Sequence, residues 1–231
     1  MHGDKIWAVV PAKDLAGAKS RLAGVLSADE RRRLTIAMLE DVLVALVDVP
    51  LAGIAVVTRD AELADCARTA GARVIADLRH AGPNAAIALA AARLAAEGAG
   101  GMIAIPADVP LATPAAIEQI VASMNAAPGV TLVPALADMG TNAIAMAPID
   151  AIPLRFGPQS FFRHQEAALA RGIAPRILRL AEIGFDLDRP EDLATFLARP
   201  SATRSFAFLS GCRIPARLEA AAARGTRRTE S

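Results

Sequence analysis

Two adjoining stretches near the start of the chain decide its fold class. Residues 6–11 read IWAVVP, and residues 12–22 read AKDLAGAKSRL. The first stretch is apolar, rich in β-branched residues and ends at a proline, which predicts a short buried strand followed by a loop. Ser27 and Glu30 then form a capping-box pattern ahead of apolar residues at helical spacing, so a long helix should follow the loop and end before Pro50.

The same alternation of strand and helix repeats along the first half of the chain. Strands are expected at residues 54–58, 73–76 and 102–106, and helices at residues 61–70 and 84–97. Continuously apolar strands separated by helices are typical of a mostly parallel sheet that is covered on both faces. Ligands of such sheets bind at the carboxyl ends of the strands, so chemically active side chains are expected in the loops that follow the strands.

The second half of the chain departs from this rhythm. A helix is expected over residues 113–124 and a strand over residues 130–134, followed by strand-like segments at residues 143–147 and 184–187. No linker divides these segments from the first half of the chain. Residues 1–200 are therefore predicted to form one domain.

Residues 201–231 form a C-terminal extension with a less regular pattern. Residues 205–209 are predicted to form a strand and residues 215–224 a short helix. The apolar side chains of this extension would pack either on the domain or across the interface of a homodimer. The sequence alone leaves both arrangements open.

Composition excludes several classes of protein. Of the 231 residues, 54% are hydrophobic and 21% are charged, as in an ordinary globular domain. The 25 Lys and Arg residues nearly balance the 24 Asp and Glu residues, so no nucleic acid is expected as a partner. No apolar stretch reaches the roughly 18 residues of a membrane-spanning helix. The two cysteines, Cys66 and Cys212, cannot make a disulfide framework, and a cytoplasmic protein is expected.

The loop after the first expected strand carries cations among small residues. Lys13, Lys19 and Arg21 alternate there with alanine and glycine. Backbone N–H groups and cations in such a loop are suited to bind phosphates. The loop matches neither the Walker A pattern nor the dinucleotide-binding fingerprint, because the required glycines are missing. A solvated loop with ordinary surface charges is the alternative interpretation.

Three aspartates are candidate metal ligands. Asp108 lies between prolines after the strand expected at residues 102–106, and Asp186 and Asp188 would point to the same side of a strand. Mg²⁺ takes few protein carboxylates and leaves its other positions to water and substrate phosphates. Because Asp188 precedes Pro190, it is assigned a helix cap or a supporting role, and Asp186 is favoured for the metal. A turn-capping role is the alternative for Asp108.

Two further loops that contain glycine, at residues 138–142 and 155–160, are candidates to bind a small anion. Ser160 lies near the start of a helix expected over residues 159–171. The N-terminus of such a helix favours a phosphate or a carboxylate. Turns without a ligand are the alternative for both loops.

The histidines suggest neither a catalytic triad nor a metal site. His2, His80 and His164 share no suggestive spacing with a serine, a cysteine or a carboxylate. Surface or helix-capping positions are therefore expected for all three. Binding of phosphate and Mg²⁺ is the chemistry that the residues themselves favour.

Short motifs spread over most of the chain carry a resemblance to one family. They are Lys13, AKSRLA at residues 18–23, AMLEDVL at 37–43, PNAAI at 83–87, DVP at 108–110, GTNA at 140–143, RFGP at 155–158 with Ser160 and His164, and DLD at 186–188 with PEDL at 190–193. In this order and spacing, the motifs resemble the phospho-carboxylate guanylyltransferases of deazaflavin coenzyme F(420) biosynthesis. The resemblance implies a three-layer α/β nucleotidyltransferase fold of the glycosyltransferase-A-like type, with a mostly parallel mixed central sheet.

The resemblance also implies an activity. Members of this family transfer GMP from GTP to the phosphate of a three-carbon phospho-acid and release pyrophosphate. They use 2-phospho-L-lactate, phosphoenolpyruvate or 3-phospho-D-glycerate, and the product passes to a second transferase that joins it to a deazaflavin precursor. The expected partners are therefore GTP, a small phospho-carboxylate and that downstream transferase. The composition, rich in alanine and arginine, indicates a GC-rich bacterial genome, and by that association phosphoenolpyruvate or 3-phospho-D-glycerate is favoured over 2-phospho-L-lactate.

Three sets of site residues follow from the resemblance. The residues implied in catalysis are Lys13, Asp108 and Asp186, of which the two carboxylates would also hold Mg²⁺. The residues implied in nucleotide binding are Lys19 and Arg21 on the GTP phosphates and Asn84 on the guanine side. The residues implied in acceptor binding are Lys13, Thr141, Gly157 and Ser160.

Two other functions stay open from the sequence. A nucleotidyltransferase of the same fold could act on a sugar phosphate or a pterin, and would be inactive with three-carbon phospho-acids. A catalytically silent scaffold would bind GTP and release no pyrophosphate. The presence of both candidate metal ligands, Asp108 and Asp186, argues against a silent scaffold.

Overall fold

The computed structural model describes residues 5–77, 82–124 and 127–229, with side chains as far as residue 221. His2 and His80, expected at surface or capping positions, lie outside these residues. The strands are β1 (Ile6–Pro11), β2 (Gly53–Thr58), β3 (Arg73–Ala76), β4 (Gly101–Ala104), β5 (Gly129–Pro134), β6 (Thr141–Ala147) and β7 (Arg176–Ile177). The helices are η2 (Ser20–Leu22, 3-10), α1 (Ala28–Val47), α2 (Ala61–Thr69), α3 (Pro83–Ala96), α4 (Pro114–Ser123), α5 (Ser160–Leu169), α6 (Ala181–Gly184), α7 (Pro190–Leu197), α8 (Arg204–Ser210) and α9 (Ile214–Thr229).

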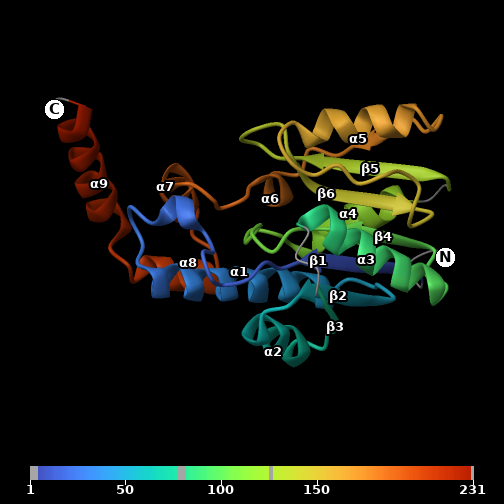
Figure 1. Ribbon diagram of the computed structural model, residues 1–231, viewed down its shortest axis with the longest axis horizontal. Helices are drawn as coiled ribbons and strands as arrows, with labels where there is room; N and C mark the ends of the chain where they lie inside the picture. Colours follow the sequence, from blue (N-terminus) through green and yellow to red (C-terminus); the bar gives the residue numbers. More distant parts are fainter. Residues whose placement is uncertain (1–4, 78–81, 125–126, 230–231) are drawn as a thin grey trace.

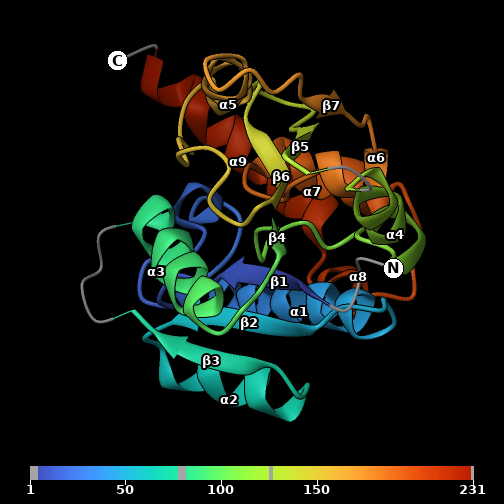
Figure 2. The ribbon, with the colours of Figure 1, turned by 90° about the vertical axis from the view of Figure 1, so that its right-hand side faces the viewer.

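The strands form one mixed sheet in the order β3-β2-β1-β4-β6-β5-β7 (Figures 1 and 2). Neighbouring strands from β3 to β4 pair in parallel, as do β5 and β7, whereas β6 is antiparallel to both β4 and β5. Trp7 of β1 lies opposite Gly53 of β2. A Cβ atom at Gly53 would lie 2.6 Å from the Trp7 ring, so a side chain there would displace this ring. The predicted mostly parallel sheet is confirmed.

Helices cover both faces of this sheet and make three layers (Figure 2). Alternate residues of β1 point to opposite faces, as the period of a strand requires. Ala8 and Val10 belong to the apolar cluster that contains Leu43 of α1, and Val9 belongs to the cluster that contains Ile87 of α3. In the part of the chain that is described, no helix combines the length and apolar character needed to cross a membrane.

A smaller lobe lies beyond the carboxyl ends of the central strands. It gathers the loop after β1, the start of α1, and helices α7, α8 and α9 (Figure 1). Its buried side chains are Leu22, Val25, Leu26, Leu34, Met38, Phe185, Leu187, Leu193, Phe196, Leu209, Cys212 and Ile214. Residues of the C-terminal extension contribute to this cluster: Leu209, Cys212 and Ile214 are buried in it, and Leu218 and Ala221 of α9 pack against it.

Local sequence signals explain most of the elements. The Ser27 hydroxyl accepts a hydrogen bond from the Glu30 N–H at 3.2 Å, and the Glu30 carboxylate accepts one from the Ser27 N–H at 2.8 Å. This reciprocal cap starts α1 at the predicted place. Two expectations are wrong. Residues 205–209 lie in helix α8 rather than a strand, and residues 184–187 leave the short helix α6 without forming a strand.

Candidate active site

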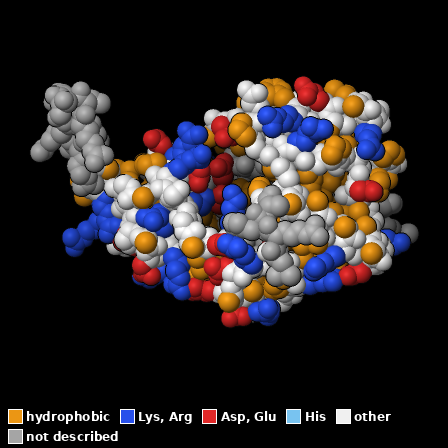
Figure 3. Space-filling view, in the orientation of Figure 1, with side chains coloured by type: hydrophobic (Ala, Val, Ile, Leu, Met, Phe, Trp, Pro, Cys, Tyr) orange, Lys and Arg blue, Asp and Glu red, His pale blue; other side chains and the backbone are white. Residues whose placement is uncertain are grey.

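A cavity of about 780 Å³ opens at the carboxyl ends of β1, β2 and β4, between the sheet and the lobe. The space-filling view shows acidic and basic side chains side by side around a hollow in this region (Figure 3). Six of the nine site residues implied by the sequence line the cavity: Lys13, Lys19, Arg21, Asp108, Thr141 and Asp186. The other three, Asn84, Gly157 and Ser160, are not among its lining residues.

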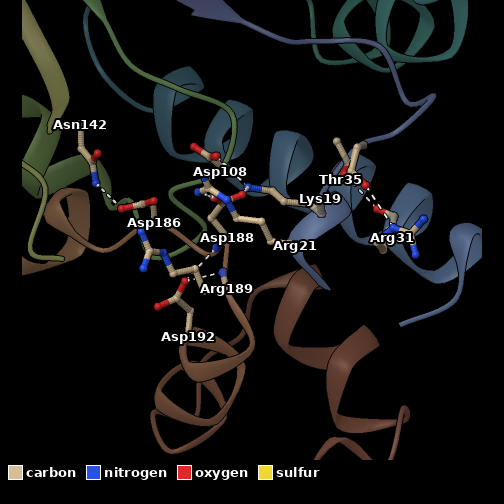
Figure 4. Close-up of polar contacts among 11 residues, drawn as sticks. Lys19, Arg21, Arg31, Thr35, Asp108, Asn142, Asp186, Asp188, Arg189 and Asp192 are labelled. Carbon is tan, nitrogen blue, oxygen red and sulfur yellow. Dashed lines mark hydrogen bonds and ion pairs between the residues drawn. The ribbon is translucent and has the colours of Figure 1, made fainter. Parts of the chain in front are cut away.

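Lys19, from the loop after β1, lines the cavity and reaches toward Asp108 and Asp188. It adopts a left-handed backbone conformation, with φ of 50°, at the residue before η2. Its Nζ donates a hydrogen bond to Asp108 Oδ2 at 2.7 Å and lies 3.5 Å from Asp188 Oδ1 (Figure 4). The Arg31 side chain fixes this loop by donating to the backbone oxygens of Ala18 and Leu26, at 3.2 Å and 2.8 Å.

Charges around Lys19 decide its protonation. Only 8% of its side chain is exposed, and burial alone would lower the pKa of its ammonium group. The negative charge of Asp108 and the hydrogen bond to it, with the charges of Asp188 and Asp186, outweigh burial and raise the pKa above its ordinary value. Lys19 is therefore a fixed buried cation whose position is set by carboxylates.

Backbone contacts bring Asp108 and Asp186 to one place although they are far apart in the chain. The Leu187 N–H donates to the Asp108 backbone oxygen at 3.0 Å, which ties the loop after β4 to the segment after α6. Asn142 at the start of β6 donates to Asp186 Oδ1 at 3.2 Å and to the Gly184 oxygen at 2.9 Å (Figure 4). This bridge orients the Asp186 carboxylate in the cavity.

Asp186 and Asp188, the two carboxylates of the segment after α6, have pKa values shifted in opposite directions. Burial raises the pKa of Asp186, and the nearby charge of Asp108 adds to this effect against the opposing Asn142 hydrogen bond and Lys19 charge. Burial would also raise the pKa of Asp188, but the charges of Lys19 and Arg21 outweigh burial and hold it below its ordinary value. At Asp186 the charge of Lys19 thus compensates burial only in part, whereas Asp188 is fully compensated.

The expected helix cap at Asp188 is wrong. The Asp188 carboxylate forms ion pairs with Arg21 and Lys19 and lines the cavity. The start of α7 is instead capped by Asp192, whose Oδ2 accepts from the backbone N–H groups of Asp188 and Arg189 at 3.0 Å and 2.7 Å. The alternative expectation, a supporting role for Asp188, agrees with this geometry, because its carboxylate holds Lys19 and Arg21 in place.

A further set of polar residues, Thr141 and Ser160, lies at and behind the cavity wall at the amino end of β6. Thr141 lines the cavity, and the Ser160 hydroxyl, buried behind it, donates to Thr141 Oγ1 at 3.2 Å. Asn84 exchanges two hydrogen bonds with the backbone of Phe156, of 3.0 Å and 2.7 Å. Gly157 follows with φ of +133°, a conformation that is essentially restricted to glycine. Asn84 and Gly157 therefore shape the loop that carries Phe156 to the cavity.

His164 does not occupy the expected surface or capping position. It is fully buried in α5, and both of its ring nitrogens are hydrogen-bonded. Burial, with a smaller effect of the Arg155 charge, lowers its pKa to about 4. No local pattern indicates that His164 is buried and hydrogen-bonded, because its partners Thr141 and Arg155 come from separate segments of the chain.

Two further cavity residues were missed by sequence reasoning. Asp14 accepts hydrogen bonds from the Arg59 Nε at 2.7 Å and 2.6 Å, and both residues line the cavity beside the loop after β1. Arg59 directly follows β2, so the rule that ligands bind at the carboxyl ends of parallel strands could have found it. Asp60 anchors the same corner, because its Oδ2 accepts from the Leu15 N–H at 3.1 Å.

The donor set of the cavity fits a hard divalent cation that is shared with substrate phosphates. Asp108 and Asp186 both line the cavity, and the negative charge of Asp108 contributes to the raised pKa of Asp186. Across the described residues, no group of three His, Cys, Asp or Glu side chains is arranged to hold a metal by itself. Mg²⁺ commonly binds through one or two carboxylates and completes its shell with water and phosphate oxygens. The residues present therefore fit Mg²⁺.

The fold and cavity together define a class of protein. The mixed, mostly parallel sheet has the nucleotide-diphospho-sugar transferase fold, and its cavity carries cations and paired carboxylates at the strand ends. The chain belongs to the family described as "Guanylyl transferase CofC like", which matches residues 6–229.

Curated relatives carry related names. The chain is 42% identical to a phosphoenolpyruvate guanylyltransferase of Rubrobacter xylanophilus over 191 residues, which cover 82% of this chain and 92% of that relative. It is 35% identical to a 3-phospho-D-glycerate guanylyltransferase of Phenylobacterium zucineum over 209 residues, 88% of this chain and 94% of that relative.

Solved structures support the fold. A putative nucleotide-diphospho-sugar transferase from Desulfovibrio desulfuricans matches 94% of this chain and 98% of its own length, with a TM-score of 0.74 and 14% identity. A nucleotidyl transferase from Methanothermobacter matches 84% of this chain and 96% of its own length, with a TM-score of 0.61 and 18% identity. At such low identity these likenesses concern the fold alone.

Proposed function

We propose that this protein transfers GMP from GTP to the phosphate of a three-carbon phospho-acid and releases pyrophosphate, as a step of coenzyme F(420) biosynthesis. The observation that carries the proposal is the joint lining of one cavity by Lys13, Lys19 and Arg21 with Asp108 and Asp186. The names of the relatives, which are phosphoenolpyruvate and 3-phospho-D-glycerate guanylyltransferases, support the nucleotide and the acceptor class.

Lys19 and Arg21 are assigned to the GTP phosphates. Lys19 is buried between Asp108 and Asp188, so its ammonium group is already in place before the nucleotide arrives. Preorganised cations stabilise charge that develops in a transition state without reorganising at that moment. Asn84 is assigned to the guanine side, where it acts through the Phe156 backbone that its amide holds.

Lys13, Thr141, Gly157 and Ser160 are assigned to the acceptor. The attacking atom is an oxygen of the acceptor phosphate, and it attacks the α-phosphorus of GTP in line with the departing pyrophosphate. A phosphate monoester has a second pKa of about 6, so the nucleophile is already anionic near neutral pH and no general base is needed. Catalysis then consists of alignment and charge neutralisation, with Lys13 between two anions that repel each other.

Nucleotidyltransferases as a class require a divalent cation, and we assign Mg²⁺ to this one. Asp108 and Asp186 would hold it, because both are oxygen donors that line the cavity. When bound, the metal supplies positive charge to the phosphate oxygens of the nucleotide. Asn142 keeps Asp186 oriented for this role through its 3.2 Å hydrogen bond.

Among the acceptors, phosphoenolpyruvate is the first to test and 3-phospho-D-glycerate the second. Relatives at 42% and 39% identity are named phosphoenolpyruvate guanylyltransferases. A hand-off of the product to a downstream deazaflavin transferase, and a cytoplasmic location, stay predictions. The location agrees with the two free thiols of Cys66 and Cys212.

Homodimerisation also stays a prediction. It is checked by sedimentation of the full chain against a chain that ends at residue 221. An earlier cut after Arg199 would remove Leu209 and Ile214 from the buried cluster of the lobe and unfold the protein locally. A dimer that becomes a monomer on shortening would assign the interface to the end of α9.

The test of the proposed function is pyrophosphate release from GTP and Mg²⁺ in parallel reactions. Each reaction contains phosphoenolpyruvate, 3-phospho-D-glycerate or 2-phospho-L-lactate, and controls omit the acceptor or replace GTP with ATP. We expect release that requires GTP and one of the first two acceptors. GTP binding without release in any reaction would contradict the proposal and favour a scaffold or another acceptor class, such as a sugar phosphate or a pterin.

A further inference from the structure

His164 lies directly behind the acceptor side of the cavity without lining it. Its side chain is fully buried, and the Phe156 ring packs against it edge to face with ring centroids 5.0 Å apart. The ring contacts Thr141 of the proposed acceptor subsite and the backbone of the loop that leads to Gly157. Its Nε2 is 2.9 Å from the Arg155 backbone nitrogen, and its Nδ1 is 2.9 Å from Thr141 Oγ1.

These two contacts fix which ring nitrogen carries the proton. A backbone N–H can only donate, so Nε2 must accept from Arg155 and must be unprotonated. The neutral ring then has its proton on Nδ1, which donates to Thr141 Oγ1. The low pKa of His164, about 4 as a result of burial and the Arg155 charge, keeps the ring neutral at physiological pH.

The Thr141 hydroxyl can therefore still donate a hydrogen bond but cannot accept a further one. Its oxygen accepts from His164 Nδ1 and also from the Ser160 hydroxyl at 3.2 Å, and a hydroxyl oxygen has two lone pairs. Both lone pairs are in use, so Thr141 can act toward a ligand only as a donor. Since Thr141 lines the cavity, its proton is available to an anion bound there.

We infer that His164 is a positioning residue that makes the Thr141 hydroxyl an obligate hydrogen-bond donor to the acceptor's phosphate or carboxylate. The inference rests on the proposed function. Ser160 supports the same arrangement in the free protein, because its hydroxyl donates to the Thr141 oxygen. A subsite of this kind selects anionic oxygen atoms and disfavours groups that themselves donate a hydrogen bond.

Two substitutions of His164 separate its two hydrogen bonds. In His164→Gln the amide reaches the position of Nε2 and can still accept from Arg155, but the donor to Thr141 is lost. In His164→Asn the amide reaches the position of Nδ1 and can still donate to Thr141, but the acceptor for Arg155 is lost. We expect His164→Gln to raise the KM for the acceptor about 10- to 100-fold, as for loss of a hydrogen bond to a charged group, with the KM for GTP unchanged. His164→Asn should keep an acceptor KM near that of the wild type and lower the thermal unfolding midpoint.

Coupling to Thr141 distinguishes positioning from a merely structural role. Thr141→Val should raise the acceptor KM as His164→Gln does, and the double variant should be no worse than Thr141→Val alone. Ser123→Ala is the matched control, because it removes a hydroxyl paired with Thr131 at 2.7 Å outside the cavity. This control should lower stability and leave the acceptor KM unchanged. If His164→Gln raised the acceptor KM by the same factor in the Thr141→Val background as in the wild type, the inference would be overturned.

The tautomer itself gives a readout that needs no activity. Nitrogen-15 NMR of the wild-type chain should show the neutral His164 ring protonated at Nδ1, with the signals assigned by their absence in His164→Gln. A proton on Nε2 would overturn the inference. Titration calorimetry of phosphoenolpyruvate and 3-phospho-D-glycerate completes the design. If the wild type binds an acceptor without releasing pyrophosphate, the proposed function fails while the His164 effect on acceptor affinity is still measured; if neither acceptor binds, both fail.

Discussion

At the scale of single residues, the site is a balance of charges that are costly to bury. Lys19 is buried and stays charged because three carboxylates surround it. Asp188 is compensated by two cations, whereas Asp186 is buried with only partial compensation. Functional sites commonly keep groups whose ionised form is unfavourable in the free protein. This difference can be tested by unfolding, because the ionised Asp186 carboxylate should destabilise the folded protein and the ionised Asp188 carboxylate should stabilise it.

We predict that Asp186→Asn does not lower, and can raise, the stability of the free protein at pH 7. A carboxyl whose pKa is raised on folding binds protons more tightly in the folded state, so its contribution to stability falls as the pH rises through the window above the ordinary value of 3.8. The neutral amide removes that loss. Pyrophosphate release should nevertheless fall about 100-fold or more, because removal of one electrostatic group from an active site has effects of this size. Thermal unfolding and turnover of the same sample check both parts.

Asp188→Asn is the matched comparison and should behave in the opposite way. The pKa of Asp188 is lowered on folding, so its stabilising contribution is present above the ordinary value of 3.8 and is lost as the pH falls through the lowered pKa. The amide variant should therefore unfold at a lower temperature than the wild type at pH 7. The difference should shrink as the pH is lowered below 4. A higher unfolding midpoint for Asp188→Asn would refute the assigned charge balance.

At the scale of elements, local signals predicted the helices that carry their own caps. Ser27 and Glu30 determine the start of α1, and Thr113 caps α4 by accepting from the Ala116 N–H at 3.2 Å. Helix α8 was missed because Phe206 and Phe208 alternate with other residues as in a strand. Helix α8 does carry a local cap, because the Thr203 hydroxyl accepts from the Phe206 N–H at 3.3 Å, and this signal was overlooked. The other support of its N-terminus is a tertiary contact from Asp41 of α1, which accepts from the Arg204 and Ser205 N–H groups and cannot be seen in a local pattern.

The candidate site likewise contains residues that the sequence predicted and one, His164, that it did not. The cations after β1 and the carboxylate after β4 were predictable, because parallel strands present their following loops at one edge of the sheet. Asp186 was predicted to share a face with Asp188 in a strand; no strand forms, yet both carboxylates line the cavity. The role of His164 was not predictable. Its partners lie in β6 and in the loop before α5, and only their packing around one ring reveals it.

We predict that the Asp41 contact is a major source of stability for α8. Asp41 is buried and accepts from the Arg204 N–H at 2.7 Å, from the Ser205 N–H at 3.0 Å and from the Ser205 hydroxyl. Asp41→Ala leaves these buried donors without an acceptor, which should lower the free energy of unfolding by about 2–3 kcal/mol. Urea denaturation checks the value.

Glu40→Ala is the control for this prediction, because Glu40 is the neighbour of Asp41 in α1. Its carboxylate lies 3.5 Å from the Arg204 Nε, and both side chains are exposed. Exposed ion pairs contribute about 0–1 kcal/mol, so this variant should stay close to the wild type. Equal losses in the two variants would mean that charge near α8, rather than the buried cap, stabilises the helix.

At the scale of the whole molecule, the cavity lies between two separately packed bodies. The sheet and its covering helices form two apolar clusters, and the lobe has a third. The cavity draws Asp108 and Thr141 from the sheet side and Arg21 and Asp188 from the lobe side. The Leu187 N–H bond to the Asp108 backbone oxygen crosses between them. A ligand that contacts both sides should therefore hold the lobe against the sheet.

We predict that GTP with Mg²⁺ slows hydrogen exchange of the Leu187 amide and leaves that of the Leu178 amide unchanged. The Leu187 amide exchanges when the lobe separates from the sheet, an opening that a bridging ligand opposes. At a ligand concentration about 100 times the Kd, binding stabilises the closed form by about 2.7 kcal/mol, or roughly 100-fold in exchange rate. The Leu178 amide, bonded to the Leu132 oxygen at 3.0 Å, lies beside β7 at the far edge of the sheet and serves as the internal control. Equal slowing of both amides would mean that the nucleotide stabilises the molecule as one unit, and an unchanged Leu187 amide would mean that it contacts only one of the two bodies.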